Sequence, residues 1–238
     1  MAKLYAQEGW RVGICGRDLT KLPDLKAWPL IFPYQVDVTN LAALRQAVNN
    51  FAPAGVDLMI ANAGISVGDK KPLPDFADIR NILATNVGGA LNALEVALEK
   101  MIPQKKGQVV LTASVAGMVG LPSAAAYSAS KAYLLKLGES LNLDLKPVGI
   151  TVTTIAHGFV DTPLTRKNQH RMPFLIPVEQ GAAAYKKAID QKKSFYIFPW
   201  KMRWTMIFLE RIPRCCYRLI IRLATPIFYR PKKERAKQ

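Results

Sequence analysis

Short runs rich in valine and isoleucine alternate along this chain with longer stretches in which apolar residues recur at helical spacing. Strands are predicted at residues 11–16, 31–38, 56–61, 108–112 and 149–155, and helices at residues 41–51, 79–101 and 125–145. Strands that alternate with helices form a parallel sheet covered on both faces. The chain has 238 residues, 50% of them hydrophobic, which is enough for one α/β domain with a substantial core.

The strongest chemical signal is the sequence Tyr-Ser-Ala-Ser-Lys at residues 127–131. Tyr127 and Lys131 are four residues apart and therefore share one face of a helix. A free tyrosine has a pKa of about 10, and a nearby ammonium lowers it by stabilising the tyrosinate. Ser114, thirteen residues upstream, can donate a hydroxyl hydrogen to a substrate oxygen. The three side chains predict a general acid/base site, whereas a Tyr–Lys pair alone usually marks an ordinary helix surface.

These residues, with several shorter motifs, resemble the short-chain dehydrogenase/reductase family from Met1 to about Pro199. The matching motifs are Asp37-Val38 on the adenine side, Asn62-Ala63-Gly64, Asn86 at the position of a fourth catalytic residue, and residues 159–163 after the sixth strand. The resemblance implies a Rossmann-like, doubly wound parallel sheet at residues 1–199. Residues 200–238 then form a separate helical tail.

The resemblance also implies a role for each matched residue. Tyr127 would exchange a proton with the substrate oxygen, and Lys131 would lower the tyrosine pKa and hold the nicotinamide ribose. Ser114 would orient the substrate, and Asn86 would support a water relay to Lys131. The implied catalytic residues are Asn86, Ser114, Tyr127 and Lys131, and the implied cofactor-binding residues are Arg17, Asp37, Val38, Asn62, Ala63, Gly64, Tyr127, Lys131 and Thr162.

The end of the first predicted strand indicates the cofactor. NAD-preferring relatives carry an acidic residue at this tip, but this chain has Gly16 followed by Arg17. A guanidinium at that point suits the 2′-phosphate of NADP(H). In the alternative interpretation, Arg17 caps a solvated loop and pairs with Asp18.

The family's first strand and its T-G-x-x-x-G-I-G loop do not occur in the 238 residues. That strand lies between the second and the fourth, so its absence leaves a gap of about two strand spacings of roughly 4.8 Å. The loop cradles the pyrophosphate, so we expect this chain to bind a dinucleotide weakly. Two explanations stand: Met1 is an internal methionine of a longer reading frame, or the gene is shortened and its product is inactive.

Histidines and cysteines give weaker signals. His157 replaces a proline common in the family and is expected to fill a corner of the fold, although it could titrate near neutrality. His170 lies in the variable lid and is expected to be solvated. No cluster has metal-ligand spacing, so no metal is predicted. Cys15, Cys215 and Cys216 do not make a disulfide framework, which indicates a reducing, cytoplasmic setting.

The tail, residues 200–238, concentrates positive charge. Eleven lysines and arginines and only two glutamates occur there, in a chain of net charge +16. Arg211, Arg214, Arg218 and Arg222 predict a basic stripe on a helix bounded by Pro213 and Pro226. Mixed aromatics and aliphatics favour a helix lying on a membrane surface, at the inner face of a membrane. The alternatives are packing on the domain, packing in a homodimer, or a solvated face, while the large aliphatics argue against nucleic acid.

The leading hypothesis is an NADP(H)-dependent oxidoreductase that interconverts a carbonyl and a secondary alcohol on a lipophilic small molecule. The rivals are a non-catalytic, truncated protein of the same fold and a membrane-surface interaction protein whose function lies in the tail.

Overall fold

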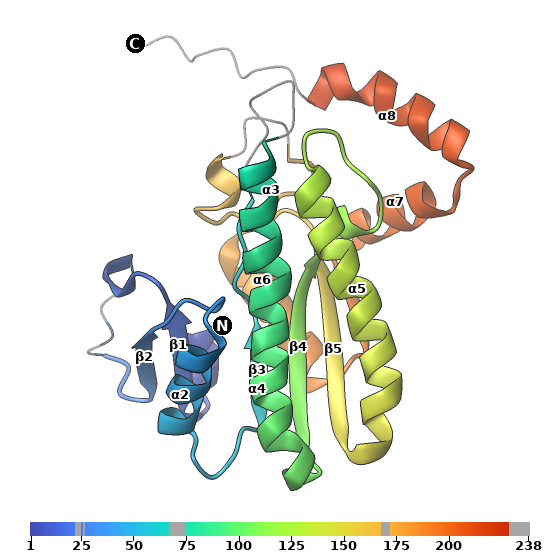
Figure 1. Ribbon diagram of the computed structural model, residues 1–238. Coiled ribbons are helices and arrows are strands. Elements are labelled where there is room, and N and C mark those ends of the chain that lie inside the picture. Colours follow the sequence, from blue (N-terminus) through green and yellow to red (C-terminus); the bar gives the residue numbers. More distant parts are fainter. Residues whose placement is uncertain (22–24, 26, 67–74, 168–171, 229–238) are drawn as a thin grey trace.

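A computed structural model describes residues 1–21, 25, 27–66, 75–167 and 172–228 of the chain (Figure 1). The strands in these ranges are β1 (Val12–Gly16), β2 (Ile31–Gln35), β3 (Leu58–Ala61), β4 (Gly107–Ser114), β5 (Ile150–His157) and β6 (Phe195–Phe198). The helices are α1 (Ala2–Gln7), α2 (Leu41–Phe51), α3 (Phe76–Leu83), α4 (Gly89–Gln104), α5 (Ala125–Leu145), α6 (Val178–Asp190), α7 (Trp200–Arg211) and α8 (Arg214–Phe228). Short helical turns are η1 (Leu19–Lys21), η2 (Ala84–Gly88), η3 (Val115–Gly117), η4 (Lys146–Val148) and η5 (Thr165–Lys167).

The strands form two separate parallel sheets. β1 pairs with β2, in a register that places Ile14 opposite Pro33, and the second sheet has the order β3-β4-β5-β6. Pro33 has no N–H to donate, which suits an edge strand. Figure 1 shows the β1–β2 pair standing apart from β3. The α/β fold with parallel strands is confirmed, and the break between β1 and β3 falls where the sequence predicts a missing strand.

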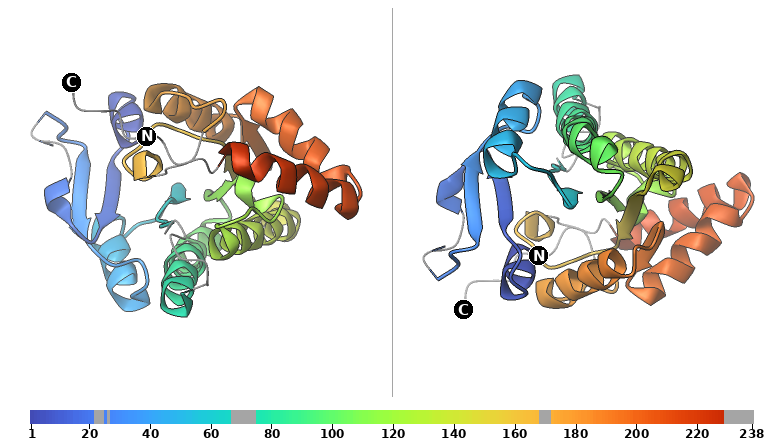
Figure 2. Two further views of the ribbon diagram at one scale, coloured as in Figure 1. Left: turned by 90° about the horizontal axis from the view of Figure 1, so that it is seen from above. Right: turned by 90° about the horizontal axis from the view of Figure 1, so that it is seen from below.

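The core lies on the two faces of β4 and β5. Val109 and Leu111 pack with residues of α2, α4 and α5, whereas Val110, between them, packs with residues of α6. All three side chains are 0% exposed, because successive strand residues point to opposite faces and helices cover both (Figure 2).

The break in the sheet leaves β3 less well covered than β4. Leu58, Met59 and Ile60 are only half-buried, although they lie one strand away from the fully buried centre. Leu58 and Ile60 join a cluster with Tyr5 of α1 and Val12 of β1, so side chains rather than backbone hydrogen bonds connect the two sheets there.

Several helix boundaries differ from the sequence prediction. Residues 79–101 were predicted as one helix, but the π-helical turn η2 separates α3 from α4. Helix α6 and strand β6 were not predicted. The break between α7 and α8 falls at Pro213, as predicted, whereas α8 runs to Phe228 and so continues past Pro226. His170, which is expected to be solvated, lies outside the described residues.

We expect the β1–β2 sheet to open more readily than the four-stranded sheet, because a two-stranded sheet is only marginally stable by itself. In native-state hydrogen exchange, amides of residues 12–16 and 31–35 should exchange faster than those of residues 107–114 and 150–157. Equal protection of both sheets would contradict this expectation and would mean that the two open as one cooperative unit.

Candidate active site

The buried side chain of Asn86 connects three parts of the chain. It lies in the π-helical turn η2 and is 0% exposed. Its Nδ2 donates to the Ile65 carbonyl at 3.0 Å and to Ser130 Oγ at 3.0 Å, and its Oδ1 accepts from the Ile65 N–H at 2.8 Å. The amide therefore fixes the loop after β3 to the first turns of α5. Single π turns inside helices are frequent at functional sites.

Lys131 points its ammonium into the protein beside this amide. The side chain is 3% exposed, and Nζ donates to the Thr112 carbonyl at 2.7 Å. Burial lowers the pKa of Lys131 to about 8, because the charged form loses its hydration. A Cβ at Gly64 would lie 3.5 Å from Lys131 Nζ and 3.4 Å from Asn86 Oδ1. The glycine thus keeps the space beside the ammonium open.

Tyr127 lies one turn before Lys131, and Lys131 Nζ is 5.7 Å from the centroid of its ring. Burial raises the pKa of the Tyr127 phenol, and a hydrogen bond with Ser114 acts in the opposite direction. The sequence predicted a pKa lowered by Lys131. In this structure burial has the larger effect, since a phenolate would lose most of its hydration and the ammonium is directed to the Thr112 carbonyl.

Ser114 ends β4 opposite His157 of β5 and is 6% exposed. Its Oγ donates to the His157 carbonyl at 3.3 Å and accepts from the Ala116 N–H at 3.2 Å. The serine hydroxyl is therefore positioned by backbone groups as well as by its hydrogen bond with Tyr127. Tyr127, Ser114, Lys131 and Asn86, which the sequence analysis grouped, come together at the carboxyl end of the four-stranded sheet.

Two contributors to this site were not singled out from the sequence. Ser130 Oγ donates to the Tyr127 carbonyl at 2.7 Å and accepts from Asn86, so it links the helix turn to the amide. Its position inside the Tyr-Ser-Ala-Ser-Lys motif was a usable signal, because serine in a helix commonly bonds to a carbonyl three or four residues back. The Thr112 carbonyl accepts a hydrogen bond from Lys131. This contact could not be predicted from the sequence, because every residue has a backbone carbonyl and side-chain patterns do not indicate which one accepts.

The loop after Ser114 lies unusually close to α5. A Cβ at Gly117 would come within 2.6 Å of Lys131 C and of Ala132 N. Real Cβ contacts with backbone atoms are not that short, so only glycine permits this approach. The distance between Ser114 and the helix that carries Tyr127 and Lys131 depends on it.

Of the predicted cofactor residues on this sheet, Asn62 and Ala63 are exposed just after β3. Asn62 Oδ1 accepts from the Thr112 hydroxyl at 3.4 Å. Thr162 is engaged locally: its N–H donates to Thr165 Oγ1 at 2.8 Å, and the two hydroxyls are 3.1 Å apart. The Thr162 hydroxyl is thus held in a turn, near the start of η5.

The remaining predicted cofactor residues follow the strands of the smaller sheet. Arg17 is exposed, and its carbonyl accepts from Gln35 Nε2 at 3.1 Å. The pKa of Asp37 is lowered, chiefly by hydrogen bonds from the Thr39 N–H and hydroxyl at 2.9 and 2.8 Å, with a smaller contribution from the Arg17 charge. The Val38 carbonyl accepts from Asn92 Nδ2 at 2.8 Å, which attaches this segment to α4.

His157 is built into the fold as the sequence analysis favoured. Its Nδ1 lies 2.8 Å from the Gly158 carbonyl, and its ring is 6.0 Å from that of Tyr185. Burial lowers the pKa of His157 to about 4, so the imidazole is neutral at pH 7.

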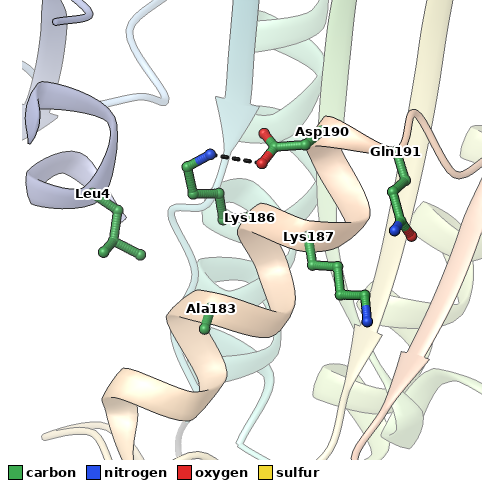
Figure 3. A pocket seen from close by; sticks show the side chains of 6 residues that line it. All are labelled: Leu4, Ala183, Lys186, Lys187, Asp190 and Gln191. Carbon is green, nitrogen blue, oxygen red and sulfur yellow. Dashed lines mark hydrogen bonds and ion pairs between the residues drawn. The ribbon is translucent and has the colours of Figure 1, made fainter. Parts of the chain in front are cut away.

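A hollow of about 370 Å³ between α1 and α6 stands apart from these residues (Figure 3). Lys186, on its wall, is paired with Asp190 at 2.6 Å and with Glu8 at 2.9 Å, so the charge of this lysine is neutralised. Among the described residues, no group of His, Cys, Asp or Glu could hold a metal ion. The same residues include no helix long and apolar enough to cross a membrane.

The residues present fit one end of a nicotinamide dinucleotide. A buried ammonium beside an open glycine suits ribose hydroxyls, and the adjacent phenol and serine hydroxyl suit a carbonyl oxygen. The other end fits less well, because in the part of the chain that the structure describes no glycine-rich turn leads from a strand into a helix at the break between the two sheets. The fold and site together define an α/β protein in which a serine, a tyrosine and a buried lysine lie close together at the carboxyl end of a parallel sheet.

Comparison with known proteins identifies the family. The family profile "short chain dehydrogenase" matches residues 1–173, and the chain belongs to this family of oxidoreductases. An uncharacterized oxidoreductase of Myxococcus xanthus is 37% identical over 210 residues, covering 85% of this chain and 83% of that protein. The 3-oxoacyl-[acyl-carrier-protein] reductase FabG of Rickettsia prowazekii is 30% identical over 168 residues, covering 70% and 69%. A solved short chain dehydrogenase from Burkholderia cenocepacia, in complex with NADP, shares the fold with a TM-score of 0.79 at 23% identity, covering 92% of this chain and 91% of that one.

Gly117→Ala should destabilise the protein and displace the serine loop from α5. Overpacking against backbone costs about 1–3 kcal/mol, and for a chain of this length Tm falls by roughly 2–4 °C per kcal/mol. Gly120→Ala is the matched control, because a Cβ there meets nothing within 4 Å. Equal melting temperatures for the two variants would contradict the close approach.

Proposed function

We propose that this protein interconverts a carbonyl and a secondary alcohol on a lipophilic small molecule, with NADP(H) as the cofactor. The proposal rests chiefly on one observation: the Tyr127 phenol is hydrogen-bonded with Ser114, and its ring centroid lies 5.7 Å from the buried Lys131 ammonium. A bound nicotinamide supplies or accepts the hydride.

The chain's own residues would handle the proton and the substrate. When the substrate binds, Ser114 would turn its hydroxyl hydrogen from the His157 carbonyl to the substrate oxygen and so orient the substrate. Tyr127 donates its phenolic proton to that oxygen during reduction and accepts one during oxidation. Below a pH of about 8, Lys131 carries its proton, so it can stabilise the tyrosinate that is left and bond to the ribose hydroxyls. Asn86 holds the loop and helix that frame these groups.

Tyr127→Phe should remove most turnover while leaving the fold intact, since general acid/base catalysis contributes about 10²–10⁴-fold. NADPH oxidation would be followed with aldehydes and ketones of increasing chain length, at millimolar NADPH because a pyrophosphate cradle is missing from the described residues. The melting temperature serves as the folding control. A variant with activity within a factor of two of the parent would refute the assignment of Tyr127.

The preference for NADP(H) over NAD(H) is proposed from Gly16 and Arg17. Arg17 is exposed at the end of β1, where its guanidinium can reach a 2′-phosphate. The Burkholderia relative that holds NADP supports the same choice by fold alone.

The double variant Gly16→Asp, Arg17→Ser should reverse the preference. A Cβ at Gly16 meets nothing within 4 Å, so the new carboxylate can be accommodated. A charged contact to phosphate is worth about 1.5–3 kcal/mol, which is roughly tenfold or more in affinity. Arg17→Lys, which keeps the charge, should retain the parent's preference. Equal affinity of the parent for the two cofactors, measured by calorimetry, would count against the proposal.

The split sheet favours a second candidate, a non-catalytic protein that keeps the fold. The two halves of the proposed cofactor site follow β1 and β3, which belong to different sheets. If the parent shows neither turnover nor NADPH binding at millimolar concentration while remaining folded, this candidate replaces the first. We propose a cytoplasmic location, at the inner face of a membrane, on the basis of three unbridged cysteines and the basic tail.

A further inference from the structure

We propose that α7 and α8 dock this protein on the surface of an anionic lipid bilayer and hold the active-site loop toward that surface. The docking does not depend on the proposed reaction, whereas the delivery of a lipophilic substrate from the bilayer does.

Helix α7 is anchored by one face and leaves an aromatic face uncovered. Met202 and Met206 are buried in a cluster with Ala156 of β5 and Ile197 of β6. Trp200, Trp204 and Phe208 recur every four residues and are 68%, 62% and 59% exposed. At about 100° per residue these three side chains form one stripe, opposite the methionines. Tryptophan is the residue most typical of the boundary between lipid and water.

Helix α8 repeats this division. Its inner face is fixed by Tyr217, which is 8% exposed. Leu219, Ile220 and Leu223 remain exposed on the other side, and Arg214, Arg218 and Arg222 form an exposed stripe along one edge of them. Three residues of the predicted basic stripe, Arg214, Arg218 and Arg222, lie together on α8, whereas the fourth, Arg211, is the last residue of α7. Each helix packs on the domain by one face only, so the alternative of packing on the domain accounts for only part of its surface.

Charge decides which partner suits this surface. The described part of the tail carries six lysines and arginines, all exposed, against Glu210 alone. Lys201 and Arg203 lie 5.7 and 5.8 Å from the ring centroids of Trp200 and Trp204, so cations flank the aromatic stripe directly. A second copy of the chain would bring the same positive charge to the interface and be repelled. Cations beside an apolar stripe match the phosphates and acyl chains of an anionic bilayer.

The tail is attached to the active-site loop. The Tyr217 hydroxyl donates to the Gly120 carbonyl, and Val115 and Val119 pack in the same cluster as Met202, Met206 and Tyr217. Gly120 lies between Ser114 and Tyr127 in the sequence. Figure 1 shows α7 and α8 beside this loop, at the end of the sheet that carries the site. A surface that holds the tail therefore also lies next to the loop bordering the site.

The test is co-sedimentation of the full chain with vesicles of phosphatidylglycerol and phosphatidylcholine, and with phosphatidylcholine alone. We expect binding to the anionic vesicles that weakens with salt. The triple variant Arg214→Gln, Arg218→Gln, Arg222→Gln should bind on the order of 100-fold more weakly, at roughly fivefold per arginine. Lys3→Gln, Lys146→Gln, Lys187→Gln makes the same charge change at three exposed lysines outside the tail and should bind nearly as well as the parent.

Two further readouts separate insertion from charge alone. Brominated phosphatidylglycerol should quench the fluorescence of the parent and much less that of Trp200→Phe, Trp204→Phe, which keeps Trp10 and Trp28. Vesicles should also slow hydrogen exchange at residues 118–121. Quenching without protection of this loop would overturn the orientation.

Other outcomes overturn the docking itself. These are equal vesicle binding by the two triple variants, binding to duplex DNA but not to vesicles, or a soluble dimer that Trp200→Ser, Trp204→Ser converts to monomer in the absence of vesicle binding. None of these measurements needs turnover. The docking can therefore be tested even if the protein does not catalyse the proposed reaction.

Discussion

The buried amide of Asn86 is the interaction on which the rest of the site depends. It satisfies both hydrogen-bonding groups of Ile65 and reaches Ser130, so one side chain sets the positions of a strand-end loop and a helix. A buried polar group that lacked these partners would cost about 1–3 kcal/mol. Helix α5, which this amide holds through Ser130, places the Lys131 ammonium against the Thr112 carbonyl. The ammonium also lies near the ring of Tyr127. The side chains of the site are therefore positioned by hydrogen bonds to backbone carbonyls and to the Asn86 amide.

Much of this arrangement could be predicted from the sequence, because it depends on local spacing. Tyr127 and Lys131 lie on one helix, and the five predicted strands and the helices at residues 41–51 and 125–145 appear close to their expected positions. The π turn at Ala84–Gly88 could not be predicted, since the hydrogen bonds of its Asn86 with Ile65 and Ser130 are tertiary contacts that local sequence does not reveal. For the same reason the raised pKa of Tyr127 was missed: burial of the phenol is a property of the assembled site, and the neighbouring lysine alone suggested the opposite direction.

The tail illustrates a second limit of sequence patterns. Regular arginine spacing predicted a basic helix, and Pro213 does separate α7 from α8. The pattern could not tell which residues face the domain, because the packing partners of Met202 and Trp204 are set by the assembled fold. Exposure resolves this: methionines anchor α7, and tryptophans line its outer side.

The break between the two sheets has a consequence for how copies of this protein behave in solution. Within the described residues β1 pairs with β2 alone and β3 with β4 alone, so each has an edge at which backbone groups lack a strand partner. Such edges are templates for pairing with another chain. A net charge of +16 makes copies repel one another and opposes that pairing. The excess of lysine and arginine thus acts as a kinetic barrier to self-association, and its effectiveness diminishes as salt shortens the range of the repulsion.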